Sequence, residues 1–171
     1  TGMTHLITID NRKGSFTFGK EIVLPVTVID SPPLIVCAIR AYELEYTGLR
    51  TLTEAWAQNL PKDLSRVMTP PKAPRTEEAL GKIENSLEKV REIRVLAATQ
   101  PRLAGVSRKA PEIIEVKVSG ETVKEQFEYA KSMLGKEVKS SDVFQEGQWV
   151  DVAGISKGKG IQGPCLLYTS D

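Results

Sequence analysis

Alternating apolar and polar residues predict β-strands in the first quarter of the chain. Residues 3–9 and residues 23–29 are rich in β-forming side chains, and a polar turn cluster at residues 10–15 follows the first run. Pro25 lies inside the second run, which predicts an edge strand or a bulge because proline cannot donate a ladder hydrogen bond. Residues 34–46 are typical of a longer strand.

The middle of the chain changes to helical spacing. Residues 54–59 predict a short helix that ends before the proline-rich loop of residues 60–75. Thr76 is a predicted helix cap, because a threonine side chain accepts a hydrogen bond from the first helical turn. The apolar residues that follow recur on one helical face: Leu80, Ile83, Leu87 and Val90. Residues 93–98 then predict a strand.

The last third returns to strands around a second helix. Residues 114–118 alternate apolar and polar side chains after the basic loop of residues 100–110, which predicts a half-buried strand. A helix is expected over residues 121–134, and Gly135 stands where a glycine commonly ends a helix. Residues 143–155 predict a hairpin.

These elements predict a mainly β fold with an α+β insertion. We expect residues 1–46 and 112–164 to form one β-barrel, with the helix of residues 121–134 as an excursion from it. Residues 47–111 are expected to form the inserted α+β lobe. The reason is that strand patterns lie at both ends of the chain, whereas the middle is helical and rich in proline.

Composition narrows the classes of function. The 171 residues carry 23 basic and 22 acidic side chains, and this net charge of +1 gives no global argument for binding nucleic acid or membranes. The only histidine is His5, and Cys37 and Cys165 lie far apart, which leaves too few ligands for a zinc site or partners for a catalytic triad. No apolar run approaches the roughly 18 residues that a membrane span requires. We therefore predict no catalytic residue, metal, cofactor, small-molecule substrate or membrane contact.

The most unusual segment is rich in glycine and lysine. Gly158, Gly160 and Gly163 match the G-x-G-x-x-G pattern of dinucleotide-binding loops, but Pro164 follows at once and no helix pattern begins. A nucleotide-binding enzyme that uses residues 158–163 is therefore an alternative for which only half of the dinucleotide-binding motif is present. A thin basic loop also suits contacts with a sugar-phosphate backbone, because glycines permit close approach. A solvated surface loop explains the same residues equally well.

Two further loops carry candidate phosphate contacts. Arg12 and Lys13 lie in the first turn cluster, and Arg102, Arg108 and Lys109 lie in the loop of residues 100–110. Aromatic residues on which bases stack are not interleaved with these charges, so solvated surface loops are the competing interpretation.

Several segments resemble one known family. The opening TGMTHLITID, the run PVTVIDSPPL, the segment AIRAY and the closing VDVAGISKGKGIQGP are similar to the universal large-subunit ribosomal protein three family, in its archaeal and eukaryotic form. The resemblance extends over residues 1–164. It implies a translation-protein-type β-barrel with an inserted α/β lobe, and a structural role in the cytoplasmic ribosome instead of catalysis.

The resemblance also implies partners and a site. The family binds large-subunit rRNA beside neighbouring ribosomal proteins, supports early subunit assembly and sends an extension towards the peptidyl transferase region. Its motif places the start of the rRNA-contacting extension at Lys157, Gly158, Lys159, Gly160, Gln162 and Gly163. A translation-factor-like barrel module outside the ribosome is a further alternative.

The chain departs from the family at both ends. The basic N-terminal segment is missing, and so is everything after Pro164. Residues 165–171 do not resemble the family, and we expect them to be a non-native tail on an internal fragment. The missing basic ends would explain the near-neutral charge.

Overall fold

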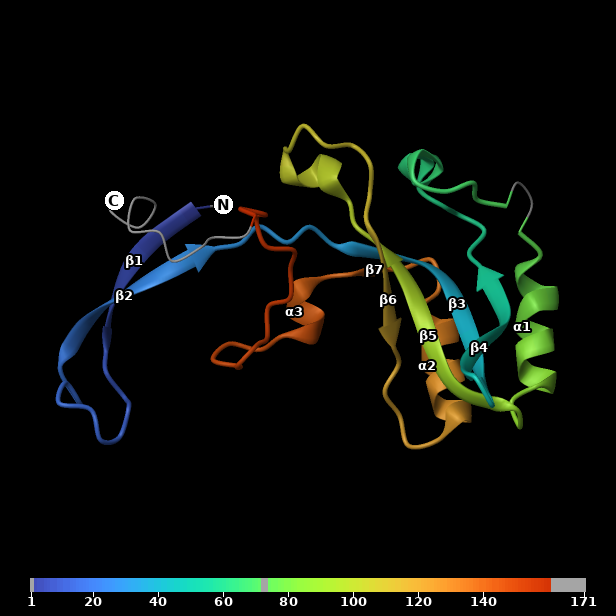
Figure 1. Ribbon diagram of the computed structural model, residues 1–171, viewed down its shortest axis with the longest axis horizontal. Helices are drawn as coiled ribbons and strands as arrows, with labels where there is room; N and C mark the ends of the chain where they lie inside the picture. Colours follow the sequence, from blue (N-terminus) through green and yellow to red (C-terminus); the bar gives the residue numbers. More distant parts are fainter. Residues whose placement is uncertain (1, 72–73, 161–171) are drawn as a thin grey trace.

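The strands of the protein form two separate sheets. The computed structural model describes residues 2–71 and 74–160. An N-terminal hairpin forms a two-stranded sheet, and a five-stranded sheet with helices beside it makes up the larger part of the molecule (Figure 1). The chain crosses from one sheet to the other without regular structure between residues 29 and 33. The hairpin therefore extends away from the larger sheet.

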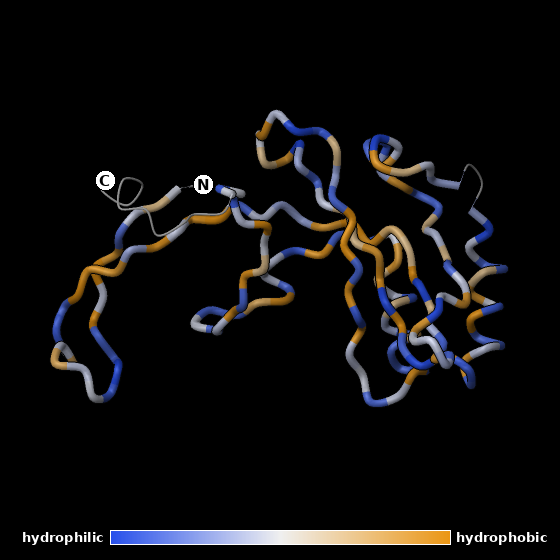
Figure 2. The backbone as a smooth tube through the Cα atoms, viewed as in Figure 1, coloured by the Kyte–Doolittle hydropathy of each residue, from blue (hydrophilic) through white to orange (hydrophobic). Residues whose placement is uncertain are grey.

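The hairpin consists of β1 (Gly2–Ile9) and β2 (Glu21–Val28), as the sequence predicts. The strands are antiparallel, with Leu6 opposite Leu24 and Pro25 opposite His5. Hydrophobic stretches run along both strands (Figure 2). Large apolar side chains are nevertheless exposed along the hairpin: Met3, Leu6, Ile7, Ile9, Val23, Leu24 and Val28. The hairpin therefore has no hydrophobic core of its own.

The larger sheet is built around β3 (Leu34–Glu45), its central strand. β4 (Gly48–Trp56) and β5 (Val90–Ala98) flank β3, and β6 (Ile113–Lys117) pairs with the other side of β5. The short strand β7 (Glu137–Val138) pairs with the beginning of β3. Every pairing is antiparallel.

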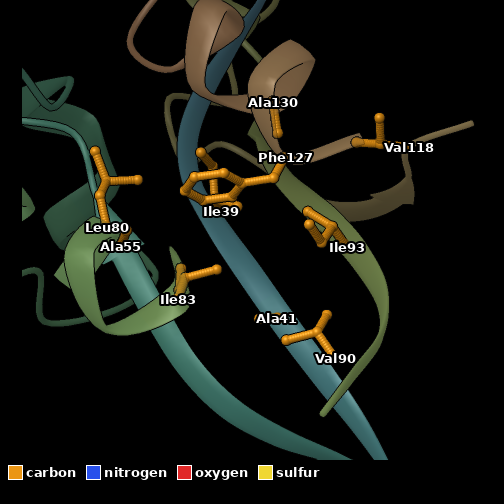
Figure 3. Packing of buried hydrophobic residues seen from close by; sticks show 10 residues of the cluster. All are labelled: Ile39, Ala41, Ala55, Leu80, Ile83, Val90, Ile93, Val118, Phe127 and Ala130. Carbon is orange, nitrogen blue, oxygen red and sulfur yellow. The ribbon is translucent and has the colours of Figure 1, made fainter. Parts of the chain in front are cut away.

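Two helices bury one face of this sheet. α1 (Thr76–Asn85) and α2 (Val123–Met133) pack Ile83 and Phe127 against Ile39 and Ile93 of the strands (Figure 3). Fully burying a side chain of this size contributes about 1.5–3 kcal/mol. The main core therefore lies between the sheet and these two helices.

The opposite face of the sheet carries a smaller core. Leu64, on the 3₁₀ helix η1 (Lys62–Arg66), packs with Cys37 and Ala98. Ala55 belongs to the main core and Trp56 packs against the smaller one, as expected because successive strand residues point to opposite faces. The sheet is thus covered on both faces at this end.

Two predicted elements near the middle of the chain are wrong. The helix expected at residues 54–59 is replaced by the end of β4, because pairing with β3 overrides the local preference. Thr76 does not cap α1; it is the first helical residue, and its hydroxyl donates a hydrogen bond of 2.7 Å to the Trp56 carbonyl. α1 ends at Asn85, so Leu87 and Val90 lie beyond it.

The expected barrel is not closed in the part of the chain that the structure describes. β1 and β2 pair only with each other, and β4 and β5, from the expected lobe at residues 47–111, share one sheet with β3 and β6. The hairpin expected at residues 143–155 is wrong too. α3 (Ser140–Val143) stands at its start, and residues 144–160 contain no strand. Trp149, Val152 and Ile155 are exposed there, because no neighbouring strand pairs with this segment.

Candidate nucleic-acid interface

The glycine- and lysine-rich segment lies open to solvent. Lys157, Gly158, Lys159 and Gly160 are all exposed and belong to no helix or strand. A side chain added at Gly158 or Gly160 would meet no atom within 4 Å, so a flat ligand can approach the backbone here. Gln162 and Gly163 lie outside the described residues. The described part of this segment can therefore present two ammonium groups beside unobstructed backbone.

Arg12 and Lys13 lie in the turn between β1 and β2, and Asp10 organises that turn. The Arg12 backbone N–H and Nε donate to Asp10 Oδ1, each at 3.0 Å, and the Thr17 hydroxyl donates to Oδ2 at 2.6 Å. These donors, with Arg12 first, hold the pKa of the Asp10 carboxyl well below its usual range. Arg12 and Lys13 both remain exposed.

The basic loop of residues 100–110 is different, because its arginines have partners. Arg102, in the 3₁₀ helix η2 (Pro101–Ala104), donates to Asp63 from Nη2 at 2.7 Å and lies 2.5 Å from it through Nε. That bidentate contact lowers the pKa of Asp63. Arg108 pairs with Glu112 at 2.6 Å. Lys109 is exposed and has no ion pair within the residues described.

The structure does not gather the three basic segments into one patch. The turn after β1 lies at the far end of the hairpin, and the η2 loop lies above the larger sheet (Figure 1). The arginines of the η2 loop have local carboxylate partners, whereas Lys13, Lys157 and Lys159 have none among residues 2–71 and 74–160. These lysines are therefore the better candidates for phosphate contacts.

Sequence reasoning missed a charged network on the larger sheet. Arg40 bridges Glu54 at 2.8 Å and Glu115 at 3.3 Å, and the Tyr42 hydroxyl donates to Glu115 at 2.5 Å. Lys117 bonds Glu92 at 2.7 Å, which with Arg94 lowers the pKa of Glu92. The three basic and three acidic side chains of this network lie on β3, β4, β5 and β6 and balance in charge. This face of the sheet therefore offers no net charge to a polyanion. Cross-strand spacing reveals such pairs only after the register is known.

Sequence reasoning also missed the aromatic side chains of the hairpin turn. Phe16 is fully exposed, Phe18 is more than half exposed, and Lys20 follows them. The signal was present as the segment Phe16-Thr17-Phe18, which Gly14 and Ser15 separate from Arg12 and Lys13.

Other kinds of site find little support. The described residues contain no group of three or more His, Cys, Asp or Glu side chains that could hold a metal ion. Among the helices of the described chain, none has the length and apolar character of a membrane span. An apolar hollow of about 630 Å³ lies beside α2 and is lined by side chains such as Val36, Val116 and Met133. It lacks the convergent polar groups that usually orient a small ligand.

Comparison with known proteins gives consistent matches. The sequence model of the family described as Ribosomal protein L3 matches residues 1–168. Large ribosomal subunit protein uL3 of Methanothrix thermoacetophila is 49% identical over 164 residues, covering 95% of this chain and 49% of that protein. The protein of the same name from Methanothermobacter thermautotrophicus is 46% identical, with the same coverage. The one from Methanopyrus kandleri is 49% identical over 166 residues, with 95% and 45% covered.

These relatives form a class of archaeal large-subunit ribosomal proteins. The chain belongs to the ribosomal protein L3 family. Membership confirms the expected family, and it favours a ribosomal role over the nucleotide-binding enzyme and the non-ribosomal module. The chain spans about half the length of the curated relatives it matches. The family match reaches residue 168, four residues into the segment expected to be a non-native tail, which lies outside the described residues.

Proposed function

We propose that this chain is part of a structural constituent of the large ribosomal subunit, which binds large-subunit rRNA and supports subunit assembly near the peptidyl transferase region. The family match over residues 1–168 is the observation that carries the proposal. The partners are large-subunit rRNA and neighbouring ribosomal proteins.

The principal rRNA contact of this chain is assigned to residues 157–163. Two lysines without a partner in the described chain flank backbone that nothing covers, at Gly158 and Gly160. An ammonium group contributes to RNA affinity by displacing the counterions of a phosphate. The open backbone lets the sugar-phosphate chain lie within hydrogen-bonding reach of peptide groups. Gln162 and Gly163 belong to the same proposed contact.

The other basic residues take secondary roles. Arg12 and Lys13 contact rRNA from the end of the hairpin, and Lys109 does so from the η2 loop. Arg102 and Arg108 are bonded to Asp63 and Glu112, which fixes the shape of the loop. Both side chains are more than half exposed, so their N–H groups outside these ion pairs can still donate to phosphate oxygens.

The finer fold is also a proposal. We propose that the hairpin and residues 144–160 complete a translation-protein-type barrel together with parts of the full-length protein outside this chain. Exposed apolar side chains on both segments, such as Leu6, Val23, Val152 and Ile155, support this idea. A two-stranded sheet alone is marginal in water and needs further strands or a helix for stability.

The rRNA contact is tested with Lys157→Ala/Lys159→Ala in the full-length protein. The affinity falls as salt rises, and each lost phosphate contact makes the slope of log K against log salt shallower by about 0.7–0.9. The double variant should therefore make the slope shallower by about 1.4–1.8. Titration of large-subunit rRNA at several salt concentrations measures the slope. Lys82→Ala/Lys89→Ala is the matched control, because both lysines are exposed and lie on or after α1.

A second variant tests close approach of the backbone. Gly158→Val keeps both charges but adds a branched side chain, and it should reduce binding if RNA lies against this backbone. Gly160 is the poorer probe, because its φ of 71° favours glycine whatever the ligand. An unchanged salt slope in the double variant, together with normal binding by Gly158→Val, would return the segment to a solvated surface loop.

A further inference from the structure

The turn between β1 and β2 is held together by many hydrogen bonds within the loop. Besides the bonds to the Asp10 carboxylate, the Gly19 N–H donates to the Asp10 carbonyl at 2.9 Å, and the Asp10 N–H donates to the Lys20 carbonyl at 3.0 Å. Consecutive turns follow, with the Ser15 N–H donating to Arg12 and the Phe18 N–H donating to Ser15. The loop therefore holds its outward-facing side chains in a defined arrangement.

This hydrogen-bonded loop presents an aromatic ring to solvent. Phe16 is 102% exposed, although burying a phenylalanine is worth about 1.5–3 kcal/mol. The same loop is well bonded internally, so exposure of Phe16 does not come from a lack of local order. An exposed aromatic on a fixed loop is the arrangement that provides a stacking surface at low entropic cost.

The charges around Phe16 are those that a polyanion requires. Lys13 and Lys20 are exposed in the loop and have no ion pair among the described residues. Arg12 is exposed too, and its Nη1 is left over from the Nε and Nη2 contacts with Asp10. The only acidic side chain of the loop, Asp10, is 2% exposed, and hydrogen bonds from Arg12 and Thr17 satisfy its carboxylate. The surface beside Phe16 is therefore basic, whereas the charge of Asp10 is directed inwards.

A second exposed aromatic provides the contrast. Tyr46, in the turn between β3 and β4, is 106% exposed. Its surroundings are acidic, because Glu43 and Glu45 precede it and the nearby Arg50 is bonded to Glu45 at 2.5 Å. Exposure of an aromatic ring therefore does not by itself indicate an RNA contact. In the loop of residues 10–20 the exposed ring is combined with Lys13 and Lys20, which have no ion pair among the described residues.

We propose that the loop of residues 10–20 binds an unpaired RNA nucleotide, with the base stacked on Phe16 and the adjoining phosphates at Arg12, Lys13 and Lys20. The inference rests on the proposed rRNA binding and adds the kind of RNA that this loop takes. A base inside a duplex is already stacked on both faces, whereas an unpaired base in a loop or bulge offers a free face to an aromatic side chain.

The experiment compares two RNA probes with the full-length protein. One probe is a single-stranded oligouridylate of about 12 nucleotides, and the other is a duplex of similar length. Phe16→Ala should weaken binding of the single strand about 5- to 150-fold, the range expected for one lost stack. Binding of the duplex should change less than about twofold. Phe16→Trp should restore single-strand binding, and Tyr46→Ala should change neither probe.

The outcomes separate this inference from the proposed function. Lys157→Ala/Lys159→Ala should weaken the binding of both RNA probes. If it does, and Phe16→Ala changes the affinity for neither probe, the inference about the loop fails while the proposed function stands. If the full-length protein binds neither probe nor large-subunit rRNA, both fail. Equal weakening of both probes by Phe16→Ala, or no rescue by tryptophan, also overturns the stacking. Loss of Phe16→Ala from assembled subunits with unchanged RNA affinity would assign Phe16 to a protein contact instead.

Discussion

The hairpin and the larger sheet are stabilised in opposite ways. In the larger sheet, α1 and α2 bury Ile39, Ile93 and Phe127 almost completely. In the hairpin, comparable side chains such as Ile7 and Val23 are more than half exposed. The order of the hairpin comes from its ladder of backbone hydrogen bonds and from the Asp10 network at its turn. One region has a buried hydrophobic core, and the other is a well-formed hairpin whose apolar side chains have no partner surface among the described residues.

The contrast teaches how exposed apolar residues should be interpreted. Scattered apolar side chains on a surface need no explanation, but a contiguous apolar strand pair usually marks an interface. The chain also covers only about half of its relatives. The exposed side chains of β1 and β2 are therefore the observation that supports the barrel proposed above.

The largest expected difference between the two regions comes from one substitution made in each. Ile39→Ala removes a fully buried side chain from the main core and should lower the free energy of unfolding by about 2–5 kcal/mol. Ile7→Ala removes the same atoms from a side chain that is 71% exposed and should change it by less than about 0.5 kcal/mol. Urea titration of the 171-residue chain measures both values.

The same pair sharpens the comparison in the full-length protein. If further strands cover the hairpin there, Ile7→Ala should become costly, approaching the cost of Ile39→Ala. A cost below about 0.5 kcal/mol in both chains would show that β1 and β2 remain uncovered and would contradict the proposed barrel.

A glycine in the hairpin turn gives the next largest effect. Gly19 has a φ of 76°, in the left-handed region, so Gly19→Ala should destabilise the turn by about 1–2 kcal/mol. No atom lies within 4 Å of the added methyl group, so the cost comes from the backbone alone. Hydrogen exchange of the Gly19 region should accelerate while exchange in α1 stays unchanged. Equal acceleration in both regions would show that the two regions unfold as one unit.

A glycine in the larger unit should respond with the opposite sign. Gly81 lies inside α1 and has open space around it, so Gly81→Ala should stabilise the protein by about 0.5–1 kcal/mol. The midpoint of urea unfolding should rise without a change in slope. A lower midpoint would mean that the absence of a side chain at this position has a packing role.

The sequence predicts local elements better than their assembly. β1, β2, β3 and α2 occur where periodicity places them, because strand alternation and helix capping are encoded over a few residues. Thr122 caps α2 by accepting from the Glu125 N–H, and Gly135 has the positive φ expected after a helix. β4 escaped prediction because its strand state depends on pairing with β3, to which its own residues give only a weak clue.

The candidate site was predictable only where its features are encoded by neighbouring residues in the sequence. Lys157 and Lys159 stand out because glycines surround them, and the structure leaves them exposed. Arg102 looked equally available in the sequence, but its partner Asp63 is 39 residues away and is brought to it only by the fold. Phe16 was overlooked because an exposed phenylalanine cannot be told from a core residue before its burial is known.

The smallest expected effect concerns acid and the Asp10 turn. Because donors hold the pKa of Asp10 below its usual range, its contribution to hairpin stability is present at neutral pH. This contribution begins to be lost below a pH of about 4, where the carboxyl of the unfolded chain takes up a proton. The loss continues as the pH falls towards the lower pKa of the folded state. Asp10→Asn should therefore accelerate exchange of the Gly19 N–H at pH 7, and the difference from the unmodified chain should shrink in acid. Glu92→Gln is the matched control in the larger sheet and should leave the Gly19 N–H unaffected. A difference that persists undiminished to pH 2 would mean that the carboxylate charge does not hold the turn.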